Sequence, residues 1–204
     1  MYHEAQRALQ DRFDARRLAD RLEAIKVREE LTEGDAAFVA GRDMFFLATC
    51  DPAGQPTCSV KAGHPGFVQV PDPRTLVFPW YDGNGMFLSA GNVAARSAVG
   101  LLFIDFETPR RVRLEGDAAL VDDPSAVAAY PGAQLLVRVA IRRVYPNCPR
   151  YIPRYQLVER SPFVPSAGYT PPVPAWKKAE WARDVVPGTI EPKQAEGSTP
   201  AESA

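Results

Sequence analysis

The sequence is poor in the residues that build disulfide frameworks and metal centres. Its 204 residues include three cysteines, Cys50, Cys58 and Cys148, and two histidines, His3 and His64. An odd number of scattered cysteines without a C-x-x-C pair argues against a disulfide scaffold and a zinc knuckle, and two distant histidines argue against a histidine-based metal site. These deficits predict a protein without a metal centre in a reducing compartment.

A long apolar segment and an excess of one charge are also missing. No run approaches the roughly eighteen apolar residues of a membrane span, and the N-terminus carries mixed charges where a signal peptide is apolar. The 24 basic and 25 acidic residues give a net charge of -1, so no overall field attracts nucleic acid or anionic membrane. We expect a cytoplasmic protein with a small-molecule ligand and neither a nucleic-acid nor a membrane partner.

The chain does contain enough apolar residues, 46% of the total, for one packed domain with appendages. From His3 to about Glu30 these residues recur at helical spacing, which predicts an N-terminal helix, within residues 1–31, whose apolar stripe packs on the core. A second helix is expected to begin at Thr32, with Asp35 completing an acidic relative of the capping box, and to stop at Gly41.

Short β-prone runs fill residues 32–160, the predicted main domain. They cover residues 45–49, 57–61, 67–70, 76–80, 100–105, 111–121, 135–142 and 155–159. Turn residues and little helix separate them, a pattern typical of an antiparallel β-barrel with peripheral helices. The run from Gly83 to Leu88 begins like G-x-G-x-x-G but lacks the last glycine and its strand–helix context, so no dinucleotide site is predicted.

The stretch from Leu76 to Asp105 carries the strongest ligand-binding signal. A strand-like run enters the loop Asp82-Gly83-Asn84-Gly85, and a second small-residue turn precedes Asn92, the expected N-cap of a short helix over residues 93–98. Small residues let backbone amides approach a ligand, and a helix N-terminus offers N–H groups to an anion, as in a phosphate cradle. Structural turns use the same residues, and spacing alone leaves that alternative open.

Two cationic positions are open to two interpretations. Arg111 and Arg113 alternate with Val112 and Leu114, which places both guanidinium groups on one face of a strand. Such a face is usually solvated, but it also suits bidentate recognition of a phosphate or a ring carbonyl. Lys61, at the end of another strand, has the same two interpretations, a solvated side chain or a ligand contact.

The order of several motifs resembles one family. The motifs are FFLAT at 45–49, DPAG at 51–54, SVK at 59–61, PGFV at 65–68, the Gly-Asn pairs at 83–84 and 91–92, GLLFID at 100–105 and RLEG at 113–116. Their succession, over roughly residues 32–160, is similar to the pyridoxamine 5′-phosphate oxidase-related, FMN-binding split-barrel family. Residues 144–152, VYPNCPRYI, resemble the C-terminal signature of one bacterial branch.

This resemblance implies a homodimer of six-stranded split barrels, with FMN in each of two clefts at the subunit interface. It places residues 58–61 beside the isoalloxazine, residues 79–89 around the ribityl and phosphate groups, Arg111 facing the flavin, and residues 147–150 near a cleft. The implied cofactor-binding residues are Ser59, Val60, Lys61, Pro79, Trp80, Asp82, Asn84, Ser89, Asn92, Arg111, Asn147, Cys148 and Arg150. No catalytic residue is implied, because a bound flavin supplies the redox chemistry itself.

Two departures from the authentic oxidase narrow the expected function. Asp82-Gly83-Asn84 stands where the oxidase has a Ser-Arg-Lys phosphate clamp, and its C-terminal Arg-x-His is not evident. The resemblance therefore implies an FMN-dependent oxidoreductase for a small molecule, without vitamin B6 oxidation. The alternatives are a non-catalytic flavin-binding module for storage, sensing or stress response, and a split barrel that uses haem or a deazaflavin.

The C-terminal part changes character. Residues 161–190 form a proline-rich extended arm with a short helix, and residues 191–204 have the composition of a disordered tail. The arm holds Phe163, Tyr169, Trp176 and Trp181, whereas solvated linkers normally lack aromatic residues. We therefore expect the arm to pack on the dimer.

Overall fold

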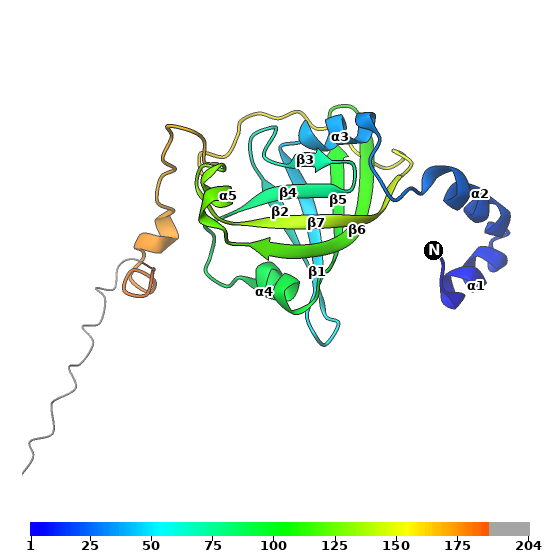
Figure 1. Cartoon of the computed structure of the whole chain (residues 1–204), viewed down its shortest axis with the longest axis horizontal. Helices are drawn as coiled ribbons and strands as arrows, with labels where there is room; N and C mark the ends of the chain where they lie inside the picture. Colours follow the sequence, from blue (N-terminus) through cyan, green and yellow to red (C-terminus); the bar gives the residue numbers. More distant parts are fainter. Residues whose placement is uncertain (188–204) are drawn as a thin grey trace, which may run out of the picture.

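The computed structural model describes residues 1–187; residues 188–204, which contain the end of the predicted arm and the whole predicted tail, lie outside the described part. Within residues 1–187, seven antiparallel strands form one sheet in the order β2-β1-β5-β6-β7-β4-β3. The strands are β1 (Met44–Cys50), β2 (Pro56–Ala62), β3 (Gln69–Asp72), β4 (Thr75–Tyr81), β5 (Ala98–Asp105), β6 (Arg110–Val121) and β7 (Ala133–Pro146). The sheet curls into a split barrel (Figure 1), which confirms the predicted mainly β fold.

Seven of the eight predicted β-runs are strands, and the run over residues 155–159 is not. Its backbone makes one hydrogen bond to the barrel, from Tyr155 N to the Phe106 carbonyl oxygen at 3.1 Å, and the two rings lie 5.2 Å apart. β-Propensity reflects packing against neighbouring strands more than an intrinsic backbone preference, and this segment has no strand beside it. The strand predicted there is therefore wrong.

Alternating burial along the strands forms the core. In β1, the side chains of Phe45 and Leu47 are fully buried, and the Phe45 ring stacks on Phe103 at 4.8 Å and meets Phe78 edge to face at 4.9 Å. In β6, Val112 and Leu114 are buried while Arg111 and Arg113 occupy the opposite face. The period of two therefore assigned both faces of β6 correctly.

Strands β6 and β7, with 12 and 14 residues, are the longest in the described sheet, and an irregularity interrupts their pairing. Their register shifts between Glu115 and Gly116. A Cβ atom at Gly116 would lie 2.4 Å from the carbonyl oxygen of Ala140, closer than any real contact. Glycine is therefore required where the two backbones approach at this bulge.

Helix α3 (Glu33–Ala40) caps one end of the barrel and has the predicted boundaries. Thr32 Oγ1 accepts a hydrogen bond from Asp35 N at 3.1 Å, and Asp35 Oδ2 accepts one from Thr32 N at 3.2 Å. The Asp35 carboxylate is buried and also pairs with Arg28 at 2.5 Å and Arg110 at 3.7 Å. The capping box thus anchors α3 to the segment before it and to the start of β6.

The N-terminal segment forms two helices, α1 (Glu4–Arg12) and α2 (Arg16–Lys26), so the single predicted helix is wrong. The break falls at Asp14, whose φ of 50° lies in the left-handed region. Neither helix buries a residue, and Figure 1 shows both set off to one side of the barrel. The apolar stripe expected to pack on the core is instead between 43% and 69% exposed at Leu9, Phe13, Leu18, Leu22 and Ile25.

Three shorter helices complete the described chain: α4 (Leu88–Ala95) after β4, α5 (Pro124–Ala128) before β7, and the 3-10 helix η1 (Ala175–Lys178) in the arm. Figure 1 places the arm and α1–α2 at opposite ends of the barrel. In residues 1–187, none of the helices is both long and apolar enough to cross a membrane.

Candidate functional site

The described sheet does not close on itself, because β2 and β3 are its free edges, and the barrel is split beside β2, where Trp80 near the end of β4 also lies. A cavity of about 1180 Å³ lies at this split. Its walls are residues 57–62 of β2, residues 79–89 at the end of β4 and in the following loop, Gln134 at the start of β7, and part of the arm between residues 176 and 187. Chain segments distant in the sequence therefore meet around one concave space.

The cavity collects one group of the predicted cofactor residues and leaves out the other. Ser59, Val60, Lys61, Pro79, Trp80, Asp82, Asn84 and Ser89 line it. Asn92, Arg111, Asn147, Cys148 and Arg150 do not. We call the first set the cavity group.

Lys61 and Trp80 face one another across the split. The Lys61 ammonium lies 3.8 Å from the centroid of the Trp80 ring, a cation–π contact that joins β2 to β4 without a backbone hydrogen bond. Burial lowers the pKa of Lys61 below its ordinary value, because the partly enclosed site disfavours the charged amine. An anion bound beside Lys61 would favour the charged amine and so oppose this lowering of its pKa, which makes the residue suited to hold one.

Polar groups gather where α4 begins. Ser59 Oγ and Ser89 Oγ lie 3.2 Å apart, and Ser89 is in the first turn of α4. No side chain caps this helix; its N-cap residue is Phe87, which has a φ of 50°. The first residues of α4, Leu88 and Ser89, line the cavity together with Ser59, and a helix start with neighbouring hydroxyls is the kind of donor set that binds phosphate.

Asn92 is not the helix cap that the sequence suggested. It lies inside α4, and its Nδ2 donates hydrogen bonds to Thr49 Oγ1 at 3.0 Å and Thr57 Oγ1 at 3.4 Å. Asn92 therefore fastens α4 to β1 and β2. The helix predicted over residues 93–98 starts five residues earlier, at Leu88, and ends at Ala95.

The loop after β4 is held by side chains of the loop and of the arm. Asn84 Oδ1 accepts a hydrogen bond from Met86 N at 3.0 Å, and Gly85 adopts a φ of 76°, which glycine tolerates. Asp82 forms an ion pair with Lys177 of the arm. The carboxylate that stands in place of a basic clamp is therefore neutralised by a cation from far along the chain.

Several cavity residues were missed by sequence reasoning because they lie on the arm. Trp176, Lys177, Trp181 and Ala182 all line the cavity, and Ala182 is almost completely buried. The aromatic content of the arm indicated that it packs somewhere. Nothing local in the sequence indicated where.

The remaining predicted residues gather at the other end of β7. Asn147 follows the last residue of β7, whereas Gln134 of the cavity is near its first, so roughly 40 Å of strand separates them. Arg111 lies beside Asn147, whose backbone N–H points to the Arg111 carbonyl oxygen at 3.5 Å. Arg111 Nε and Asn147 Oδ1 are both buried, and neither has a hydrogen-bond partner in the described chain. We call this pair, with the adjacent Cys148 and Arg150, the far group.

The described part of the chain has no cluster of metal-binding side chains. Residues 1–187 contain no group of three or more His, Cys, Asp or Glu side chains placed to hold a metal ion. The three cysteines are free; Cys58 and Cys148 are exposed, and Cys50 is half-buried.

Comparison with known structures gives several similar chains at low identity. A candidate pyridoxamine 5′-phosphate oxidase from Lactobacillus delbrueckii is 24% identical, with a TM-score of 0.48 over 59% of this chain and 99% of that one. HupZ from Group A Streptococcus is 15% identical, with a TM-score of 0.47 over 57% and 94%. An FMN-binding protein from Syntrophomonas wolfei is 9% identical, with a TM-score of 0.43 over 71% and 98%.

The family assignment rests on the sequence itself. Comparison with curated proteins gives no match. The family model described as pyridoxamine 5′-phosphate oxidase matches residues 31–162, which include α3, all seven strands and both groups of predicted site residues. Helices α1 and α2 and most of the arm lie outside the match. Because the match covers more than half of the chain, this protein belongs to the pyridoxamine 5′-phosphate oxidase family.

Proposed function

We propose that the chain binds FMN in the cavity at the split of the barrel and carries out flavin-dependent redox chemistry on a small molecule. The observation that carries this proposal is the convergence of the cavity group. Eight residues that family resemblance assigned to FMN, drawn from β2, β4, the loop and α4, line one space of about 1180 Å³. A volume of that size accommodates a nucleotide-sized ligand.

The chemistry of the walls fits the two ends of FMN. Ser89 and the first turn of α4 provide neutral donors that suit a phosphate, and Lys61, which contacts the Trp80 ring, provides a positive charge beside the flavin ring. Val60, Pro79 and Trp80 provide the apolar surface that a flat ring requires. When bound, FMN would supply the electron transfer, and these residues would hold it, orient it and limit its contact with water.

The far group supports a site shared between two chains. Buried polar atoms are normally hydrogen-bonded, so Arg111 Nε and Asn147 Oδ1 indicate a surface that another molecule completes. The exposed apolar stripe on α1 and α2 points the same way, since monomeric proteins rarely expose contiguous apolar patches. We propose a homodimer in which the far group of one chain approaches the flavin held by the cavity group of the other.

Flavin is favoured over haem by the composition of the cavity. Neither histidine lines it: His3 is the N-cap of α1, and His64 follows β2 on the exposed surface. Histidine is the commonest haem ligand in binding proteins, whereas flavin needs no side-chain ligand.

The cofactor is tested on the full chain as purified. We expect a yellow protein with flavin absorbance that releases FMN, identified by mass, when it is denatured. A colourless protein that takes up no FMN from solution would refute the proposal. Release of FAD would refute the choice of cofactor.

Turnover is tested separately. Under anaerobic conditions, NADH or NADPH should bleach the flavin absorbance, and a small-molecule acceptor should restore it. A flavin that binds tightly and is never reduced by either donor would identify a non-catalytic flavin-binding module.

A further inference from the structure

The arm contacts the barrel at two points. A Cβ atom added to Gly132 would lie 2.5 Å from the Pro165 side chain, so the first half of the arm lies directly against the start of β7. Farther along, Lys177 pairs with Asp82, and the Lys177 side chain is only 11% exposed. The arm therefore contacts the barrel at two places, and the second of them, at Asp82, is in the wall of the cavity.

Between and beyond these anchors, the arm presents aromatic rings to the cavity. Trp176 and Trp181 are stacked, with ring centroids 6.0 Å apart and planes at 15°. Both line the cavity, yet Trp181 is 73% exposed. A large aromatic ring at the edge of a cavity, covered on one face only, is suited to stack with a second flat molecule.

The cavity is also larger than one ligand requires. Small-molecule pockets usually enclose ~300–1,000 Å³, and this cavity encloses about 1180 Å³. The wall made by Trp80 and Lys61 belongs to the barrel, whereas the wall made by Trp176 and Trp181 belongs to the arm. A cofactor held against the barrel wall would therefore have the arm wall on the other side of the cavity.

We propose that Trp176 and Trp181 form a second binding subsite, which takes the planar aromatic ring of the redox partner molecule, and that the Lys177–Asp82 pair holds this wall in place. The proposal rests on the proposed function in one respect, because it assigns the barrel side of the same cavity to FMN. It names planar aromatic compounds as the substrate class. Aliphatic molecules of similar charge would not stack on Trp181.

The subsite is tested by titrating the full-length protein with anthraquinone-2-sulfonate, a planar aromatic probe, and with hexanesulfonate, an aliphatic one. Trp181→Ala should bind the anthraquinone about 3- to 10-fold more weakly than the wild type, the effect of a lost ring stack. Trp181→Phe should recover most of the affinity. Phe163→Ala is the matched control, since Phe163 is an arm aromatic outside the cavity.

The outcomes separate this inference from the proposed function. Unchanged anthraquinone affinity in Trp181→Ala, equal binding of the two sulfonates, or no anthraquinone binding by the wild type would overturn the subsite, whatever the protein does with FMN. If the wild type binds the anthraquinone with the expected dependence on Trp181 but takes up no FMN, the subsite stands and the proposed cofactor fails.

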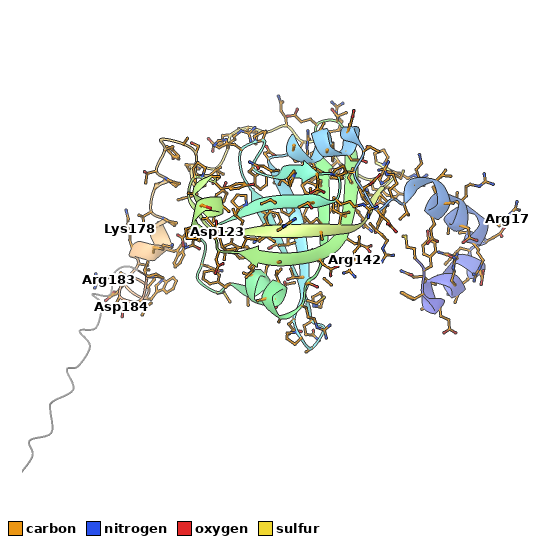
Figure 2. The ribbon with its side chains drawn as sticks, in the orientation of Figure 1. Arg17, Asp123, Arg142, Lys178, Arg183 and Asp184 are labelled. Carbon is orange, nitrogen blue, oxygen red and sulfur yellow. The ribbon has the colours of Figure 1, made fainter. Side chains whose placement is uncertain are left out.

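The anchoring role of Lys177 has its own readout. Lys177→Ala should speed tryptic cleavage after Arg183 in the intact protein several-fold, because the arm loses its ion pair to Asp82. Lys178→Ala is the matched control; Figure 2 shows Lys178 and Arg183 on the arm, and Lys178 does not line the cavity. Equal cleavage rates in both variants would show that the pair does not hold the wall.

Discussion

The two ends of strand β7 differ in how completely the chain satisfies its own polar groups. At the cavity end, Ser59 lies within hydrogen-bonding distance of Ser89, and Asp82 pairs with Lys177. At the far end, Arg111 Nε and Asn147 Oδ1 are buried without partners in the described chain. Because buried polar groups are costly when unpaired, the cavity end is the better satisfied of the two, and the far end is where we propose that a second chain completes the site.

The largest expected effect is at the cavity end. Lys61→Ala should weaken FMN binding by about 1.5 to 3 kcal/mol, the range for hydrogen bonds to charged groups, which is roughly 10- to 150-fold. Fluorescence titration with FMN measures it. Lys26→Ala, an exposed lysine at the end of α2, should match the wild type. Equal affinities in the two variants would remove Lys61 from the site.

A comparable loss is expected at the far end only if the site is shared between chains. Arg111→Ala should then weaken FMN binding by about 1.5 kcal/mol or more, roughly tenfold, without lowering the melting temperature. Arg17→Ala is the control; Figure 2 shows Arg17 on the N-terminal helices. An Arg111 variant with wild-type FMN affinity would confine the site to the cavity of one chain.

Mixing these two variants distinguishes a shared site from an indirect effect. A mixed dimer of Lys61→Ala and Arg111→Ala chains has one cleft with both losses and one with neither. Co-refolded chains should therefore regain tight FMN binding in one cleft of each mixed dimer, measured by stoichiometric titration. No recovery on mixing would contradict the shared site.

A pH titration sharpens the role assigned to Lys61. Burial lowers the pKa of Lys61, so its charge is lost at a lower pH than for an ordinary lysine. FMN affinity should fall as pH rises through that range and approach the affinity of Lys61→Ala. Lys61→Arg should show no such fall, because arginine stays protonated there. A decline of equal size in Lys61→Arg would assign the titration to another group.

The smallest expected effect concerns the arm. A chain ending at Arg160 loses the Lys177–Asp82 pair and the packing of Ala182, and should melt about 2 to 8 °C lower, for 1 to 2 kcal/mol lost. Removal of residues from Glu191 onward should leave the melting temperature unchanged. Equal melting temperatures for the full chain and the chain ending at Arg160, together with protease sensitivity throughout the arm, would show that the arm is only a tail.

Local chemistry explains which parts of the fold could be predicted from the sequence. The capping box of Thr32 and Asp35 and the alternation around Val112 and Leu114 depend on neighbouring residues alone, and both are confirmed. The prediction misplaced helix α4 because the helix starts after Phe87, which is left-handed and has no capping side chain. Asn92, by contrast, is a residue type that is common at N-caps. The N-terminal helix similarly breaks at Asp14, where there is no glycine or proline from which a break could be predicted.

The predicted site residues also fall into two groups, those that one chain brings to the cavity and those that it does not. Resemblance assigned Lys61, Trp80 and Ser89 to one ligand, and the structure brings them to one cavity. It also assigned Arg111 to that ligand, but within one chain Arg111 does not line the cavity. The contribution of Trp181 could not be predicted, because more than ninety residues separate it from the barrel wall it faces.

The split between β2 and β4 affects how the barrel unfolds. Neighbouring strands of the sheet are joined by backbone hydrogen bonds, whereas β2 at the free edge is joined to β4 in the described chain by the side-chain contact between Lys61 and Trp80. Local opening should therefore begin along this line, as it does where few hydrogen bonds resist it. A ligand that contacts both β2 and β4 would hold the two strands together, and it should raise the melting temperature as its concentration rises.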